Sequence, residues 1–316
     1  MAILIDPPVW PAHGTVWSHL VSDSDLAELH AFAFSLGVPR RGFDLDHYDV
    51  PASLHARAVS LGARAVTAKE LVHALRLSGL RVKGADRPAA YVGHRMDYLR
   101  SEWRGLGTSA RPGENALPDE AGWIALGEKL LARWTEPHRT YHDARHLEDV
   151  LLALNQLEVW GAEVAVVTKL AAWFHDAVYD GVTGDDERAS AELAHMALTR
   201  AGIDNALAET VHDFVLATIP AEAPAKVPPE LAHLLDADLS IFAASAVRYD
   251  RYANAVRAEY AHVPDVQFAL GRARILESYA AQAEIYRTGT ARDLWEAPAR
   301  VNLAREIARL RSVSSA

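Results

Sequence analysis

Residues 172–180 read AWFHDAVYD, and the polar pair His175–Asp176 inside this run decides how the C-terminal part of the chain is interpreted. The surrounding segment, residues 164–178, is apolar almost all the way round a helix, which predicts a buried central helix. A buried carboxylate costs on the order of several kcal/mol even after the protein relaxes, so Asp176 must be paired, neutralised or bound to a cation. Other residues of the chain must therefore complete this pair.

Three other polar insertions could supply the partners. His146 lies on the apolar stripe of a helix predicted over residues 141–157, so it points into the core. Asp236 and Asp238 interrupt a later apolar run, and residues 185–187 (Asp-Asp-Glu) begin the helix after the central one. A single histidine on an apolar face is usually a hydrogen-bonded core residue. Several such insertions in a chain without cysteine indicate a metal site built from His, Asp and Glu.

Length and composition predict a globular protein with two domains. The chain has 316 residues, too many for one ordinary core, and half of them are hydrophobic. Residues 1–116 carry 13 Lys and Arg against 12 Asp and Glu, whereas residues 117–316 carry 19 against 30. This acidic C-terminal part argues against a nucleic-acid polymer as partner. It allows small anionic substrates, because a bound divalent cation reverses the local charge.

The chain shows no signal for secretion or membrane insertion. Its N-terminus lacks a basic segment followed by an apolar run, and no stretch approaches the roughly 20 apolar residues of a membrane span. The absence of cysteine excludes disulfides. We therefore expect a cytoplasmic protein with no membrane partner.

The first 82 residues predict a small α/β domain with parallel-type crossovers. Residues 3–5 and 63–66 read as short strands. Ser24 or Asp25 is expected to cap a helix that Gly37 ends, Pro51 opens a second helix, and Thr67 caps a third over 68–77.

This N-terminal segment resembles an uncharacterised family of short bacterial α/β domains that has no assigned function. The likeness rests on Ile5-Asp6, Trp17-Ser18-His19-Leu20, His47-Tyr48-Asp49-Val50, and Gly62-Ala63 with Ala68-Lys69-Glu70-Leu71. Asp6 follows a strand, at the sheet edge where α/β folds place ligands, and His19, His47 and Asp49 are candidates to join it. The alternative is that these four residues serve as caps and turn residues.

Residues 83–117 read as a connector, because glycines and Pro112 interrupt any periodicity; one or two helical turns are expected over 96–103. A boundary near Pro118 then opens an all-α domain over 118–316. Its first helix is expected to be capped by Asp119. The later helices are expected at 186–201, 206–218, 229–242, 246–262 and 265–286, with a last one through 300–310.

The order His…His-Asp…Asp in this second domain resembles the HD-domain superfamily of metal-dependent phosphohydrolases, and in particular an uncharacterised branch of it. The resemblance covers about residues 120–312. The motifs that carry it are Arg139-Thr140-Tyr141-His142 with His146, residues 171–180, Asp186-Glu187-Arg188, residues 235–240 (LDADLS), residues 256–260 (VRAEY), Gly271-Arg272, and residues 299–303 (ARVNL). The fold that it implies is an all-α HD-type helical bundle.

The resemblance implies a metal held by His146, His175, Asp176 and Asp238. Asp238 is preferred to Asp236 because the superfamily's ligand directly precedes the Leu-type position, and Asp236 is then a partner for a ligand histidine. The branch carries a further histidine where this chain has Ala221, and this departure favours a single ion. Two imidazoles and two carboxylates suit Mn²⁺, Fe²⁺, Co²⁺, Ni²⁺ or Zn²⁺, with Mg²⁺ also allowed.

Polar residues near these motifs are the candidates for catalytic and substrate-binding roles. Glu187 is the candidate to orient or deprotonate water, with Asp176 as the alternative; the structural reading of Glu187 is charge compensation at a helix start. The groups expected to hold substrate phosphate are Arg139, His142, Arg145 and Lys169, with Arg257 and Arg300 more distant. Structural ion pairs are the competing interpretation for these six residues.

Three functions are compatible with these patterns. The first is a metal-dependent phosphohydrolase that acts on a small phosphorylated metabolite, a nucleotide above all. The second is a sensor that keeps the metal cage and binds a nucleotide without hydrolysing it. The third applies to the N-terminal domain, which would be an interaction or regulatory module. The sequence leaves a homodimer open.

Overall fold

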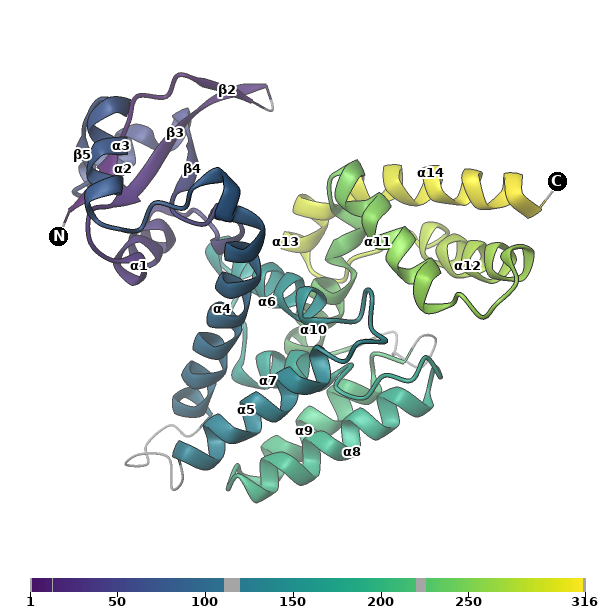
Figure 1. Cartoon of the computed structure of the whole chain (residues 1–316). Helices are drawn as coiled ribbons and strands as arrows, with labels where there is room; N and C mark the ends of the chain where they lie inside the picture. The colour runs from purple at the N-terminus through teal and green to yellow at the C-terminus, as the bar shows by residue number, and fades with distance from the viewer. Residues whose placement is uncertain (1, 13, 111–119, 220–225, 315–316) are drawn as a thin grey trace. The chain divides into compact units, whose positions relative to one another are not determined.

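The computed structural model describes residues 2–12, 14–110, 120–219 and 226–314. The chain divides into two compact units, one of residues 1–96 with 158–161 and one of residues 97–157 with 162–316 (Figure 1). The first is a small α/β unit and the second is mostly helical, as the sequence predicted. The expected boundary at Pro118 and the expected cap at Asp119 lie outside the described residues.

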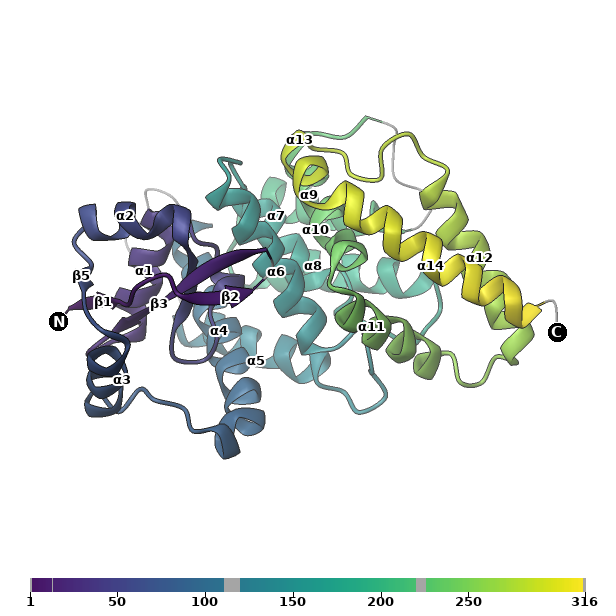
Figure 2. The ribbon, with the colours of Figure 1, turned by 90° about the horizontal axis from the view of Figure 1, so that it is seen from above.

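The α/β unit is built on a mixed five-stranded sheet, of which β3 is the longest strand (Figure 2). The sheet order is β2-β3-β1-β5, and β4 also pairs with β3. The two predicted strands, β1 and β5, pair in parallel as expected, whereas the described pairs made by β3, which was not predicted, are antiparallel. The strands are β1 (Ile3–Ile5), β2 (Trp10–Ala12), β3 (Thr15–Ser22), β4 (Tyr48–Pro51) and β5 (Arg64–Ala65).

Helices cover both faces of this sheet because side chains alternate along a strand. Ile3 and Ile5 of β1 pack in one core with α1 (Leu26–Leu36) and α2 (Ala52–Ser60), whereas Leu4 packs in a second core with α3 (Ala68–Leu77). Asp25, rather than Ser24, caps α1, and Gly37 ends it with a φ of 86°. Thr67 and Glu70 form a capping box at α3, in agreement with the sequence prediction.

The expected connector contains a long helix, α4 (Arg87–Ser109), directly preceded by the short turn η2 (Gly84–Asp86). The other short turn, η1 (Arg40–Gly42), lies earlier, between α1 and β4. Two stacked tryptophans explain the presence of Gly107 in α4. Trp103 of α4 stacks on Trp123 of α5 (Glu120–Trp134) with ring centroids 4.2 Å apart, and each indole N–H donates to the other's backbone carbonyl. A Cβ at Gly107 would lie 2.6 Å from Trp123, and one at Gly127 would lie 2.3 Å from Trp103. Close packing therefore requires glycine here.

The helical unit continues with elements close to those predicted. They are α6 (Ala144–Val159), α7 (Val166–Phe174), α8 (Asp185–Arg200), α9 (Asn205–Leu216), α10 (Pro229–Asp238), η3 (Leu239–Ala243), α11 (Ala246–Glu259), α12 (Asp265–Ala280), α13 (Gly289–Ala291), the π-helical turn η4 (Arg292–Glu296) and α14 (Ala297–Ser314). Two differences matter for the site. The central helix α7 ends at Phe174, before His175, and the helix expected over 229–242 changes to a 3-10 turn after Asp238.

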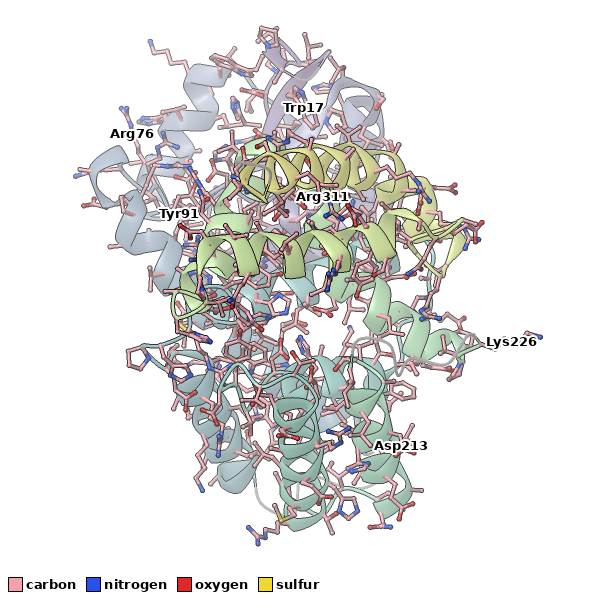
Figure 3. All side chains as sticks on the ribbon, turned by 90° about the vertical axis from the view of Figure 1, so that its right-hand side faces the viewer. Trp17, Arg76, Tyr91, Asp213, Lys226 and Arg311 are labelled. Atoms are coloured by element: carbon pink, nitrogen blue, oxygen red, sulfur yellow. The ribbon has the colours of Figure 1, made fainter. Side chains whose placement is uncertain are left out.

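Helices α12 and α14 run side by side at the C-terminal end of the helical unit, as Figures 1 and 3 both show. The guanidinium of Arg311 on α14 donates to both carboxylate oxygens of Glu277 on α12, at 2.8 and 2.5 Å. Among the described residues, no helix is long and apolar enough to cross a membrane.

Candidate metal centre

Four side chains from three separate places in the helical unit converge on one point. The Nε2 atoms of His146 and His175 lie 3.1 Å apart. The Asp176 carboxylate lies 3.5 Å from the first and 3.2 Å from the second, and the Asp238 carboxylate lies at 3.2 and 3.6 Å. The structure thus brings together all four residues that the sequence suggested as ligands.

These separations are those of donors around one small cation. With metal–ligand bonds of about 2.1 Å, neighbouring donors lie about 3.4 Å apart in a tetrahedral site and about 3.0 Å apart in an octahedral one. Among the described residues, His146, His175 and Asp176 also form one of two His-containing groups compact enough to hold an ion. The geometry fits a first-row transition ion.

The end of α7 fixes the orientation of His175. Its Nδ1 lies 2.8 Å from the carbonyl oxygen of Ala172, so this nitrogen donates and Nε2 presents its lone pair to the cluster. Trp134 packs near the ring, with centroids 5.5 Å apart, and its indole N–H donates to the Trp173 carbonyl at 3.0 Å. His175 therefore lies just past the central helix rather than within it, and that helix end supplies the acceptor that aligns the ligand.

The charges in the cluster require a counterion or protons. Burial alone would lower the pKa of His146, but hydrogen bonds to Asp176 and Asp238 outweigh it and raise that pKa to about 9. Burial opposes ionisation of the two carboxylates as well, yet the facing histidines hold the pKa of each below its usual range. Two carboxylates facing two neutral imidazoles carry a charge of −2, which one divalent cation balances.

A cavity of about 430 Å³ opens beside the cluster, and Asp176 and Asp238 lie in its wall. Most of the remaining wall is aromatic or apolar, with a few polar groups. The aromatic lining residues are Tyr141, Tyr179, Phe242, Tyr252, Tyr260, Phe268 and Tyr279, and the cationic or titratable ones include His142, Glu187 and Arg272. Concave, mostly apolar sites with a few convergent polar groups are typical of small-molecule binding.

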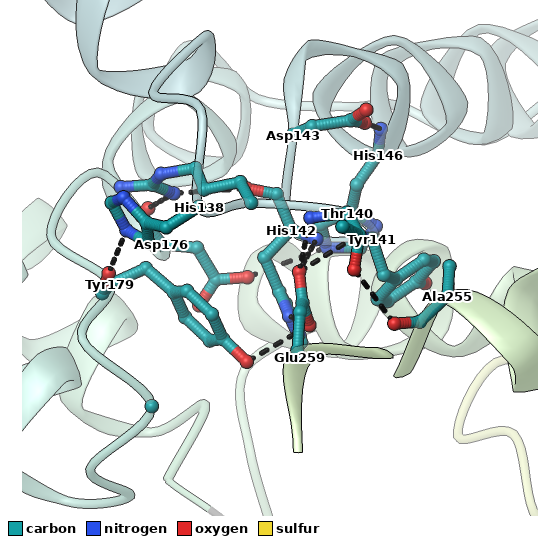
Figure 4. Close-up of polar contacts among 12 residues, drawn as sticks. His138, Thr140, Tyr141, His142, Asp143, His146, Asp176, Tyr179, Ala255 and Glu259 are labelled. Carbon is teal, nitrogen blue, oxygen red and sulfur yellow. Dashed lines mark hydrogen bonds and ion pairs between the residues drawn. The ribbon is translucent and has the colours of Figure 1, made fainter. Parts of the chain in front are cut away.

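Glu259, at the end of α11, holds the loop that carries His142 (Figure 4). One carboxylate oxygen accepts the backbone N–H groups of Thr140, Tyr141 and His142 at 2.9, 2.7 and 3.0 Å. The other lies 2.7 Å from His142 Nδ1 and 3.0 Å from the hydroxyl of Tyr179. The His142 ring also stacks on Tyr179, with centroids 4.3 Å apart. This arrangement leaves His142 Nε2 as the ring's available polar atom.

Sequence patterns assign no role to Glu259 beyond its place in the motif at 256–260. Its function depends on a loop more than a hundred residues earlier in the chain, which no local pattern indicates. Its position as a charged residue near the end of a helix was the one sequence feature that could have suggested a role for Glu259.

Glu187 lines the cavity and also closes the start of α8. Its carboxylate accepts the Gly184 N–H at 2.5 Å, so its structural role is present. Burial, to which the negative charge of Asp176 adds, raises the pKa of Glu187. Asp186 has a different task, because it accepts the N–H groups of residues 180, 181 and 182 at 3.1, 2.8 and 2.8 Å.

Three of the four residues expected to hold phosphate do not line the cavity. The Arg139 side chain is fully buried and donates to the carbonyls of His142, Asp176 and Ala177, so it joins two loops of the site. Arg145 is exposed, and Lys169 lies at a separate depression beside Ser101 and Val164. Only His142 is positioned to meet a ligand.

Other expectations about charged residues also need correction. Asp236 does not support a ligand histidine: it accepts the backbone N–H groups of Arg287 and Thr288 at 2.6 and 2.8 Å and the Thr288 hydroxyl at 2.8 Å. Arg257 pairs with Asp265, and Arg300 donates to carbonyls at residues 280, 282 and 283. Both arginines have the structural roles that were the competing interpretation.

Comparison with known proteins identifies only the first unit. A family model described as "Protein of unknown function (DUF4031)" matches residues 3–78. This agrees with the resemblance of the N-terminal segment to a short family without an assigned function. Comparison with curated proteins and with solved structures finds no match.

Proposed function

We propose that the helical unit is a metal-dependent phosphohydrolase of the HD type, which hydrolyses a phosphate ester of a small metabolite, a nucleotide above all. The observation that carries this proposal is the convergence of His146, His175, Asp176 and Asp238 in the wall of an aromatic cavity. The donor set suits one Mn²⁺, Fe²⁺, Co²⁺, Ni²⁺, Zn²⁺ or Mg²⁺ ion.

When bound, a divalent ion would act as a Lewis acid toward the phosphoryl oxygen and acidify a water molecule. Asp176 and Asp238 stay ionised because the facing histidines lower their pKa, which suits ligands and makes Asp176 a poor proton acceptor. Glu187 has a raised pKa and faces the cavity, so it is the better general base. His142, oriented by Glu259, lines the cavity and presents Nε2 to a bound ligand.

The cavity wall favours a substrate with an aromatic base. Tyr and Phe rings from several elements line it, and ring stacking on such side chains is worth about 1–3 kcal/mol per base. Arg272 adds a buried guanidinium whose charge is largely balanced by Glu306 at 3.2 Å. With few free positive groups in the wall, most of the attraction for phosphate has to come from the metal ion.

A non-catalytic sensor is the alternative, and one contact favours it. The Glu187 carboxylate is already engaged by the Gly184 N–H, so it can serve the helix start without acting on water. In this case the cavity would bind a nucleotide and release no phosphate.

The test is release of phosphate from a panel of nucleotides by the metal-free full-length chain to which each divalent ion is added in turn. We expect turnover with at least one ion, and loss of both turnover and the ion bound by this cluster in His175→Ala and Asp238→Ala, with helicity unchanged by circular dichroism. Glu187→Gln should keep the metal and lose at least tenfold in rate. Nucleotide binding without turnover under all ions would favour the sensor.

Two variants serve as matched controls. His212→Ala removes a half-buried histidine of α9, which does not line the cavity, and Glu192→Gln changes an exposed carboxylate of α8. Both should bind metal and turn over substrate as the wild type does. The same number of bound ions per chain in wild type, His175→Ala and Asp238→Ala, at full affinity, would show that the ligands are misassigned.

A further inference from the structure

The α/β unit contains a second group of histidines and carboxylates, separate from the cluster of the helical unit. His19, His47 and Asp49 form the other described group whose donor atoms all lie within 4.8 Å of one another. The Asp49 carboxylate lies 3.9 Å from His19 Nε2 and 3.7 Å from His47 Nε2. Both histidines thus present the same ring nitrogen to one oxygen.

The Nδ1 atom of each histidine is hydrogen-bonded to a buried carboxylate. His19 Nδ1 lies 2.9 Å from Asp6, whose side chain is 1% exposed, and His47 Nδ1 lies 2.7 Å from Asp46, whose side chain is 0% exposed. Each carboxylate therefore holds Nδ1 of its histidine and directs Nε2 toward Asp49. This carboxylate–histidine pairing is the usual support for a metal-bound imidazole, and here it occurs twice.

The sheet places these groups together. His19 of β3 and Asp49 of β4 are directly paired residues in adjacent antiparallel strands, so their side chains leave the same face of the sheet. Asp6 directly follows β1 and accepts the His19 backbone N–H at 2.6 Å. His47 directly precedes β4. Three neighbouring strands thus fix the arrangement.

The alternative that these residues are caps or turn residues does not account for their contacts. The cap of α1 is Asp25 and that of α3 is Thr67, whereas α2 starts after Pro51 without a side-chain cap. Asp6 and Asp46 are used instead to hold ring nitrogens.

The charges also favour a cation. Arg81 lies 3.2 Å from Asp46 and balances its charge. Asp6 and Asp49 then contribute two negative charges beside two imidazoles, and one divalent cation would neutralise them.

We propose that His19, His47 and Asp49 bind a divalent transition-metal ion, with Asp6 and Asp46 holding the two histidines in register. Two imidazoles and one carboxylate are a donor set that suits Zn²⁺ and its first-row neighbours. The side chains of His19 and Asp49 are 29% and 51% exposed, so the site is open to solvent. Three protein ligands leave at least one coordination position for water or a small ligand.

Two of the three donor separations are close to those around an ion. The separations of 3.7 and 3.9 Å exceed the about 3.4 Å edge of a tetrahedral site by a few tenths of an ångström. The half-exposed Asp49 side chain can shorten both by rotating, and the donor atoms of the two histidines lie within 4.8 Å of each other.

The experiment uses the full chain with the helical unit's cluster removed by His175→Ala and Asp238→Ala. After treatment with a chelator, it is titrated with Zn²⁺ by calorimetry, and metal content is measured after dialysis. We expect one Zn²⁺ per chain in this background, at least tenfold weaker binding after Asp49→Asn, and no bound ion after His19→Ala with His47→Ala. Asp46→Asn should weaken binding about 10- to 100-fold.

His73→Ala, which removes an exposed histidine of α3, is the matched control and should bind as the parent does. Asp49→Asn alters an exposed position and keeps the shape of the side chain, so it tests the site even where the histidine variants unfold by circular dichroism. Absence of Zn²⁺ from the parent background, or unchanged affinity in Asp49→Asn, would overturn the proposal. Neither result bears on phosphate release by the intact chain, so this site and the proposed activity fail separately.

Discussion

Replacement of Glu259 by glutamine should destabilise the helical unit by roughly 3 kcal/mol at pH 7. Burial alone would raise the pKa of this carboxyl, but the hydrogen bond to His142, the charge of His142 and the backbone N–H groups of 141 and 142 lower it from 4.5 to about 2. At about 1.4 kcal/mol per pKa unit, this shift corresponds to the stated energy. The side chain is 3% exposed, so solvent screens the interaction little.

The pH dependence has a defined sign. Because the folded pKa is depressed, the stabilisation is complete above pH 4.5 and is lost as the pH falls toward 2. The difference between wild type and Glu259→Gln in urea unfolding should therefore be about 1 kcal/mol smaller at pH 4 than at pH 7. Glu277→Gln, which changes an exposed carboxylate paired with Arg311, is the control and should leave the urea midpoint unchanged. Equal stability of Glu259→Gln and wild type at pH 7 would refute the assignment of Glu259 as the residue that holds the 140–142 loop.

Three further outcomes follow from the packing and the charges. Gly127→Ala should lower the free energy of unfolding by about 1–3 kcal/mol, since a Cβ would lie 2.3 Å from Trp103, whereas Gly105→Ala, with open space around it, should not; urea unfolding of both variants checks this. Metal binding to the helical unit should release protons at pH 7.5 and weaken at lower pH, because the pKa of His146 is about 9 without metal; calorimetry in buffers of different ionisation enthalpy measures the release. Asp236→Asn should destabilise the chain but leave metal affinity within twofold, because the partners of Asp236 are Arg287 and Thr288. Metal titration measures the affinity, and a loss larger than twofold would contradict this prediction.

The helical unit was more predictable than the sheet. Its helices follow a 3.6-residue apolar period that local sequence shows, and His146 could be placed on a core-facing stripe for that reason. Strand β3 was not predicted, because the buried Ser18 and Ser22 interrupt its apolar run. Its antiparallel partner β4 is distant in sequence, so this pairing leaves no local signal.

Two errors near the site have a common cause. Arg139 was expected to bind phosphate, and the glycines of residues 83–117, among them Gly107, to interrupt helical periodicity, since arginine is a common phosphate ligand and glycine a poor helix former. In the structure, Arg139 is fully buried against backbone carbonyls, and Gly107 gives room to Trp123. The role of each residue is set by a tertiary contact, which local sequence propensity cannot indicate.

Burial of a histidine does not by itself identify a ligand site in this protein. His30 is partly buried against Phe43 and Tyr48, and this burial lowers its pKa to about 3, so it remains a neutral packing residue. At His19 the hydrogen bond to Asp6 raises the pKa, because a carboxylate there favours a positive charge on the ring or beside it. The groups that face Nε2 therefore distinguish the two cases: where carboxylates face it, as at His175, the surroundings favour a cation. This distinction depends on neighbouring residues that the fold brings together. The sequence could therefore suggest these histidines as candidates but could not distinguish metal ligands from packing residues.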